Sequence, residues 1–310
     1  MNNLDYDVFL RKMERLVREK AGGEARVCIF PVRKNNSILL DGLALLEKGR
    51  NLAPVLYLAP YYRAYQAGEG EEELAEQILD EYERRKGSGK IDLSFYMDPL
   101  QAKKRIVCRL ISYKRNKRIL KEIPYRTFLD LAVVYYYLLE KEETGAAAIL
   151  VRREHLRMWG MDEQTLRETA EKNTRKLLPC DFLSMGDVMR DLMEPEEIRR
   201  LGLEERGREQ PDVLYMLTNR QKSFGAVWMT DQAVLERIGE RLKQDYYILP
   251  SSVHECMVVP VREGMEVRQL QEMVKEINET QVDPEEVLED TVYHYSRSRG
   301  ILQEAEAAER

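Results

Sequence analysis

The sequence predicts an α+β protein, with helices packed on one side of largely antiparallel or mixed sheets. Strand-like stretches often follow one another in adjacent pairs, as at residues 25–32 and 37–46, and helix-like stretches separate some of these pairs. A doubly wound parallel sheet would instead need a helix between nearly every two consecutive strands. The 310 residues, of which 44% are hydrophobic and 34% charged, suffice for a sizeable core under a well-charged surface.

We expect the chain to divide into an N-terminal α+β region at 1–124, a C-terminal α+β sheet region at 125–297 and a tail at 298–310. A chain of this length suits one large domain or two modest ones. The charged, turn-prone residues 194–211 are the best candidate for a linker or an insertion. The tail is charged and rich in alanine, which is typical of a frayed or helical end.

In the N-terminal region, apolar residues recur at helical spacing in two stretches, 4–20 and 71–86, with charges on the opposite face. The second stretch begins with acidic and ends with basic residues, which favours the helix dipole. Between the two helices, residues 25–32 and 37–46 flank a turn-rich sequence and predict a hairpin, and residues 53–58 predict a third strand.

The middle of the chain is predicted to form strands and then helices. The strands are expected at 105–113, 129–139 and 146–151, and the helices at 152–159 and 162–177. Gly160 should end the first helix, because glycine readily adopts the left-handed conformation found after helix ends. Asp162 should cap the second helix with its side-chain oxygen.

The last third of the chain is predicted to be the most regular. In chain order we expect a hairpin of strands 213–218 and 224–229, a helix at 231–242, strands at 246–249 and 256–261, a helix at 267–277, a helix starting at 283 and a strand at 291–296. Thr230 or Asp231 should cap the first of these helices. Pro284, directly after Asp283, is typical of a helix start.

Composition and residue spacing argue against several classes of protein. The net charge of −6 gives no overall attraction to nucleic acid or anionic lipid, and no stretch reaches the roughly 20 apolar residues of a membrane span. No signal peptide is visible, and the four scattered cysteines are typical of reduced thiols in the cytoplasm. Without CxxC or HxxxH spacing or a phosphate loop, we expect no metal and no cofactor.

Polar residues concentrate in the loop between the strands predicted at 246–249 and 256–261. Ser251, Ser252, His254 and Glu255 lie there. In an extended segment Ser252 and His254 point to the same side, and an imidazole can take the proton of a neighbouring hydroxyl. Glu255 points the other way, and no G-x-S-x-G elbow exposes the serine. A structural role is therefore the first interpretation, ligand binding the second and catalysis the third.

A second polar segment is Asn219-Arg220-Gln221-Lys222, in the turn of the predicted hairpin. A solvated turn is its simplest interpretation, since asparagine and lysine are common in turns. Asn219 and Lys222 are nevertheless candidate binding residues, because this turn and the loop at 251–255 could lie at one end of the same sheet. We treat that shared position as a hypothesis that a structure can test.

Basic residues are dense between Lys103 and Lys121, with Tyr113 and Tyr125 nearby. A basic patch with aromatic residues can bind phosphates and stack on bases. The acidic stretch at 71–83 offers the same residues internal charge partners, and the net charge adds no wider electrostatic footprint. A solvated or internally paired surface is the preferred interpretation, and nucleic acid is not expected as a partner.

Five sequence blocks together carry a family likeness. They are Lys34-Asn-Asn-Ser with Asp41-Gly42 and Ala53-Pro-Val-Leu-Tyr-Leu, Leu110-Ile-Ser-Tyr-Lys-Arg-Asn-Lys, Ala170-Glu-Lys-Asn-Thr-Arg-Lys-Leu-Leu-Pro179, Leu217-Thr-Asn-Arg-Gln-Lys and Ile248-Leu-Pro-Ser-Ser-Val-His-Glu255. Over nearly its whole length the chain resembles an uncharacterised bacterial family, common in gut anaerobes and known only as a domain of unknown function. Its C-terminal half is also distantly similar to a second uncharacterised family of Gram-positive bacteria. The likeness implies a bacterial, cytoplasmic protein and no known activity.

We therefore expect a non-enzymatic binding or regulatory protein whose partner is a protein or a small polar ligand. This expectation rests on the missing metal-ligand spacing, phosphate loop and nucleophile elbow. A hydrolase-like enzyme built on Ser252 and His254 is the alternative, and nucleic-acid binding through Lys103–Lys121 is the second alternative.

Overall fold

The computed structural model describes residues 3–22, 25–50, 53–86, 94–139, 148–192 and 213–306. These residues form two compact units that divide between Phe95 and Tyr96. They contain three antiparallel sheets together with helices, which confirms the α+β class. The boundary predicted after residue 124 falls inside the second unit, and the predicted linker at 194–211 lies outside the described residues.

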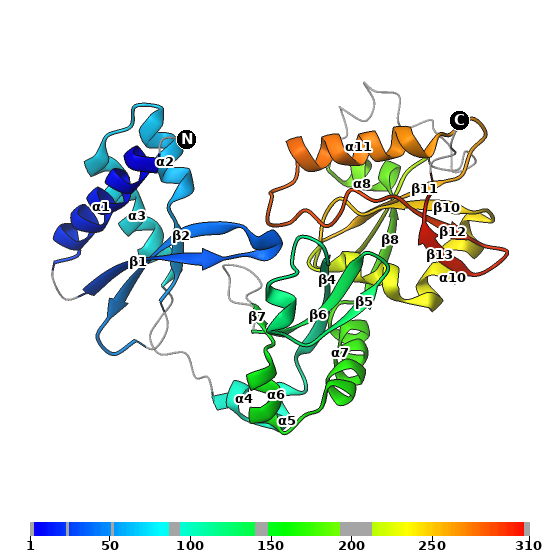
Figure 1. Cartoon of the computed structure of the whole chain (residues 1–310), viewed down its shortest axis with the longest axis horizontal. Helices are drawn as coiled ribbons and strands as arrows, with labels where there is room; N and C mark the ends of the chain where they lie inside the picture. The colour runs from blue at the N-terminus through cyan, green and yellow to red at the C-terminus, as the bar shows by residue number, and fades with distance from the viewer. Residues whose placement is uncertain are drawn as a thin grey trace. The chain divides into compact units, whose positions relative to one another are not determined.

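The first unit is a three-stranded sheet with helices on one face (Figure 1). Its elements are α1 (Asn3–Lys20), β1 (Ala25–Arg33), η1 (Asn35–Ser37), β2 (Leu39–Glu47), β3 (Val55–Tyr57), α2 (Ala59–Gln66) and α3 (Glu71–Arg85). The strands are antiparallel in the order β1-β2-β3. Met13 of α1, Tyr62 of α2 and Ile78 of α3 share one buried core with Leu43 of β2. The two predicted helices and the predicted hairpin are confirmed.

The second unit contains a four-stranded and a six-stranded sheet. Its elements are α4 (Ser94–Met97), α5 (Pro99–Ala102), β4 (Ile106–Ser112), η2 (Ile119–Lys121), β5 (Tyr125–Phe128), β6 (Leu131–Leu138), β7 (Ala148–Leu150), α6 (Arg153–Trp159), α7 (Glu163–Leu177), β8 (Cys180–Ser184), α8 (Met185–Leu192), β9 (Tyr215–Asn219), η3 (Gly225–Thr230), α10 (Gln232–Leu242), β10 (Tyr246–Leu249), β11 (Cys256–Pro260), α11 (Val267–Thr280), β12 (Tyr293–Ser296) and β13 (Ile301–Glu304). The four-stranded sheet has the order β4-β6-β5, and β7 also pairs with β6. α7 packs along β4, where the hydroxyl of Thr174 accepts the amide of Cys108.

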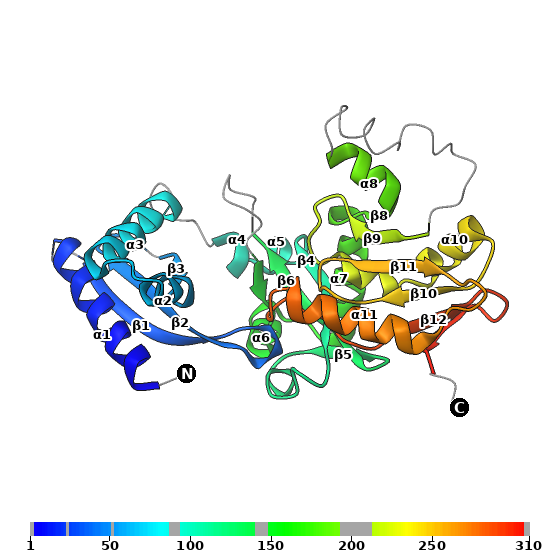
Figure 2. The same cartoon turned by 90° about the horizontal axis from the view of Figure 1, so that it is seen from above.

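The six-stranded sheet has the order β13-β12-β10-β11-β9-β8, and every neighbouring pair is antiparallel (Figure 2). α11 covers one face, where Leu270 and Val274 pack against Leu249. α10 covers the other face, where the Tyr246 hydroxyl donates to the carbonyl of Leu235 over 2.9 Å. Helices therefore lie on both faces of this sheet, whereas the three-stranded sheet carries its helices on one face only.

Residues 224–229 do not form the second strand of the predicted hairpin. β9 already pairs with β8 on one side and with β11 on the other, so it has no free edge for another strand. The segment instead forms η3, in which every residue from Gly225 to Met229 is buried. A short apolar stretch that is buried all round cannot be assigned to a strand or a helix from periodicity alone.

The predicted helix start at 283 is a turn, because its backbone bonds to another segment. The amide of Val253 donates to the carbonyl of Glu286 over 2.9 Å, and the amide of Leu288 donates to Ser251 over 3.0 Å. The end of the chain also differs from the expectation of a frayed or helical tail. Residues 301–304 form β13, which extends the sheet by pairing with β12.

Candidate functional site

The two polar segments singled out from the sequence meet at one end of the six-stranded sheet. They adjoin β9 and β11, which are antiparallel neighbours, so the turn at 219–222 after β9 and the loop at 251–255 before β11 come together. The hydroxyl of Thr218 donates to the carbonyl of His254 over 2.9 Å and joins the two segments directly.

The two serines of the loop hold its backbone in place. The hydroxyl oxygen of Ser252 accepts the amide of His254 at 3.0 Å, and Ser252 also forms a β-bridge with Val287. The carbonyl of Ser251 accepts the amide of Leu288. Both serines are buried, and Ser252 is only 3% exposed. The Ser252 hydroxyl oxygen is thus bonded to the backbone of the loop and not to the imidazole.

The imidazole of His254 is engaged through both ring nitrogens. Its Nδ1 accepts the amide of Phe224 at 3.3 Å, which leaves the ring proton on Nε2, and Nε2 lies 3.2 Å from Oε1 of Glu286. The ring also stacks on Phe224, with 6.1 Å between centroids. The carboxylate that orients this histidine therefore comes from the turn at 283–286, and not from the neighbouring Glu255, which is half-buried.

Asn219 and Lys222 differ in their surroundings. Asn219 is buried, and its side chain closes the turn by donating to the carbonyl of Ser223 and accepting the amide of Gln221. Lys222 is exposed, with a left-handed backbone (φ of 49°). Asn219 therefore supports the shape of the turn, whereas Lys222 is exposed to solvent, as are Arg220 and Gln221.

A stacked arginine from the basic stretch at 103–121 lies beside this loop, a contact that the sequence did not predict. The guanidinium carbon of Arg109, on β4, is 4.8 Å from the ring centroid of Phe224 and 5.2 Å from that of Tyr136. Phe224 in turn stacks on His254, so aromatic and cationic groups form a continuous row from the four-stranded sheet to the loop. No local pattern in the sequence marks this row, because its members come from four separate segments.

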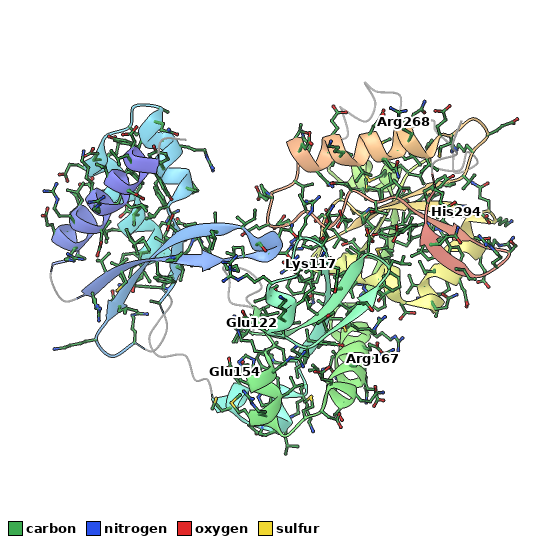
Figure 3. All side chains as sticks on the ribbon, viewed as in Figure 1. Lys117, Glu122, Glu154, Arg167, Arg268 and His294 are labelled. Atoms are coloured by element: carbon green, nitrogen blue, oxygen red, sulfur yellow. The ribbon has the colours of Figure 1, made fainter. Side chains whose placement is uncertain are left out.

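A pocket of about 480 Å³ lies elsewhere in the second unit, between α7, the four-stranded sheet, η3 and the start of α10. Cys108, Thr174, Val227 and Trp228 form part of its lining. Three arginines also line it, namely Arg126 of β5 and Arg167 and Arg175 of α7, and Figure 3 labels Arg167. We call it the arginine pocket. Its volume lies within the usual range for small-molecule sites.

Two of the three arginines have acidic partners. Nε of Arg167 donates to Glu171 over 3.0 Å, and Nε and Nη2 of Arg175 lie 3.0 and 2.9 Å from Oδ2 of Asp231. The Nε atom of Arg126 is buried and has no hydrogen-bond partner in the described part of the chain. Among the residues that the structure describes, no carboxylate forms an ion pair with Arg126 either.

The cysteine that lines the arginine pocket is not a reactive nucleophile. Burial raises the pKa of the Cys108 thiol to about 12, and the nearby charges of Arg126 and Arg167 only partly oppose this rise. Cys108 is therefore a neutral thiol at physiological pH. Because the thiolate is the nucleophilic form, this cysteine is suited to lining a binding site and not to attacking a substrate.

The basic stretch at 103–121 is partly occupied by internal contacts. Nη2 of Arg115 lies 2.7 Å from Oδ2 of Asp290, and Nη1 of Arg105 donates to the carbonyl of Leu138. Arg109 stacks on its two rings. Lys117, labelled in Figure 3, is exposed, as is Lys121. The stretch thus divides between structural contacts and solvent.

The comparisons with known proteins point to one family. The model of a family described as "Family of unknown function (DUF5688)" matches residues 6–297. No curated protein and no solved structure matches the chain. Within the described residues, no helix has the length and apolarity to cross a membrane, and no three His, Cys, Asp or Glu side chains gather where they could hold a metal ion.

Proposed function

The chain belongs to DUF5688, a family of unknown function, and we propose that it is a non-enzymatic protein that binds a small polar molecule in the arginine pocket. The observation that carries this proposal is Arg126, which lines a pocket of about 480 Å³, forms no ion pair with the described residues and has a buried Nε without a hydrogen-bond partner among them. An arginine without a charge partner beside a pocket can bind a polar ligand through its guanidinium donors.

The lining fits a bound ligand in other respects. Ligand sites combine apolar walls with a few placed polar groups. Here Val227, Trp228 and Cys108 supply apolar surface, and Arg126 supplies the free donors. The pocket is built from helices and strands, which hold such groups more firmly than loops do.

The loop at 251–255 gives less support to the hydrolase alternative. A serine nucleophile needs its hydroxyl within hydrogen-bond reach of the base. Here the Ser252 hydroxyl accepts the amide of His254, while the imidazole bonds to Phe224 and Glu286. This arrangement supports a structural role for the loop and directs the proposal to the arginine pocket.

A pocket-filling variant tests the proposal. Ala233 lines the arginine pocket and is exposed, so Ala233→Phe should fill the cavity without disturbing the core. A set of small polar metabolites should contain compounds that stabilise the wild type, by about 2.7 kcal/mol at a hundred times the dissociation constant. These compounds should not stabilise Ala233→Phe. Ala67→Phe, at an exposed position of the first unit, is the matched control and should respond like the wild type.

Two results would count against the proposal. The first is that no compound stabilises the wild type. The second is that Ala233→Phe is stabilised as much as Ala67→Phe by every compound that binds, because binding would then take place outside the arginine pocket.

A further inference from the structure

We infer that the ligand of the arginine pocket is a small organic anion, whose carboxylate or phosphate group binds the guanidinium group of Arg126. This inference rests on the proposed function and names the ligand class for the same site. It follows from the position of Arg126, from a comparison with Arg109 and from the charges around the pocket.

Arg126 reaches the pocket because of its register in the sheet. It lies opposite Val133 of β6, and Val133 lies opposite Leu110 of β4, so these three side chains share one face. Cys108 and Tyr135, two residues further along their strands, lie opposite each other on that face as well. The side chain of Arg126 thus lines the cavity from the far strand of the sheet.

Arg109 shows what a satisfied arginine looks like in the same sheet. Its Nε is also buried and without a hydrogen-bond partner among the described residues. Its guanidinium carbon, however, lies 5.2 Å from the ring centroid of Tyr136 and 4.8 Å from that of Phe224, and aromatic faces attract positive charge. No aromatic ring in the described part of the chain stacks on Arg126 in this way. A planar guanidinium with free donors matches a carboxylate or phosphate.

The neighbouring charges favour an anion at this position. Arg175 is held by Asp231, which also caps α10 through the amides of Ala233 and Val234. Arg167 bonds Glu171 through Nε alone, so its Nη groups can serve a ligand as second donors. Glu236 also lines the pocket, but it is exposed and accepts the amide group of Gln232. Arg126, which is half-buried, is therefore the arginine of the lining that has no acidic partner among the described residues.

The cavity volume and the apolar lining define the rest of the ligand. At about 480 Å³, the arginine pocket is far larger than a single inorganic anion. Val227 and Trp228 offer apolar contact beside the arginines. A small organic acid or an organic phosphate fits both features.

Titration calorimetry with four probes tests the inference. The probes are succinate and glycerol 3-phosphate, with the uncharged succinamide and glycerol as matched controls. We expect an anion to bind with a dissociation constant of about 1 mM or tighter, and its neutral counterpart to bind at least about tenfold more weakly. Binding of succinate alone would identify a carboxylate site, and binding of glycerol 3-phosphate alone a phosphate site.

Variants of Arg126 assign the effect to this residue. Arg126→Gln should weaken anion binding by about tenfold to a hundredfold, since charge-assisted hydrogen bonds are lost. Arg126→Lys keeps the charge but not the planar fork, so its loss should be intermediate. Arg118→Gln is the control, because Arg118 is exposed and outside the pocket. It should bind like the wild type.

Three outcomes would overturn the inference: neither anion binds at up to about 10 mM, the neutral probes bind as tightly as the anions, or Arg126→Gln binds as the wild type does. The proposed function is tested separately, by the response of Ala233→Phe. If a neutral compound binds the wild type and Arg126→Gln equally but not Ala233→Phe, the pocket binds ligands and only the anion assignment is wrong.

Discussion

Nε2 of His254 lies 3.2 Å from Oε1 of Glu286, while the hydroxyl of Ser252 accepts the backbone amide of His254 at 3.0 Å. The two residues that could have formed a nucleophile and its base are thus hydrogen-bonded through the backbone instead. The imidazole is oriented by a carboxylate, as in a catalytic site, but the hydroxyl is not presented to it.

Ser252 is expected to remain unlabelled by a serine-directed fluorophosphonate probe. Ser252 is only 3% exposed and its hydroxyl holds the loop, so the hydroxyl is neither accessible nor activated. Ser252→Ala should instead lower the free energy of unfolding by about 1–3 kcal/mol, because the His254 amide loses its buried acceptor. Mass spectrometry and denaturant titration measure the two effects. Labelling of the wild type that disappears in Ser252→Ala would revive the hydrolase alternative.

Gly225 is predicted to be intolerant of any side chain. A Cβ atom there would lie 2.5 Å from the carbonyl oxygen of His254 and 2.7 Å from the Cα of Thr218, and neither backbone atom can move aside easily. Gly225→Ala should lower the free energy of unfolding by at least about 3 kcal/mol, at the upper end of overpacking costs. Gly70→Ala is the matched control, since a Cβ there meets nothing within 4 Å. Similar losses in both variants would mean that η3 does not pack closely against the loop at 251–255.

Much of the fold could be predicted because its signals are local. Asp162 and Asp231 cap α7 and α10 as their positions indicate, with amides of the first turn donating to their side chains. Gly160 ends α6 in the left-handed conformation. Each of these signals spans only a few residues. η3 was wrongly predicted as a strand because the outcome depended on which edge of β9 was already taken, and that depends on distant strands.

The candidate site was less predictable than the fold, for the same reason. The loop at 251–255 stands out by composition, yet its carboxylate partner, Glu286, lies in a segment that the sequence indicated as a helix start. The arginine pocket has no sequence signal at all. Arg126 and Trp228 come from distant segments, and only the packing of α7 and η3 against the sheet brings them to one cavity.

Arg126 and Arg109 should respond differently to the same substitution when no ligand is present. Arg126→Met removes a buried donor without a partner in the described structure, so the free energy of unfolding should stay unchanged or rise by up to about 1 kcal/mol. Arg109→Met removes two cation–π contacts and should lower it by about 1–3 kcal/mol. Denaturant titration of both variants measures the difference. An equal loss in both would show that Arg126 stabilises the fold rather than serving a ligand.

The buried thiols should differ from Cys28 in reactivity and should make the protein sensitive to alkali. Burial raises the pKa of Cys108 to about 12 and also raises the pKa of Cys256, so neither forms appreciable thiolate at neutral pH. Iodoacetamide at pH 8 should therefore modify the half-buried Cys28 first, and Cys108 and Cys256 only on unfolding.

Cys108 should also make the stability of the protein sensitive to alkali. Because the folded-state pKa of Cys108 exceeds the ordinary value of 9.0, its contribution to stability is complete below about pH 9. That contribution is lost as the pH rises towards 12. The free energy of unfolding of Cys108→Ala should thus fall less steeply over this range than that of the wild type. Equal slopes would show that Cys108 titrates alike in the folded and unfolded chains.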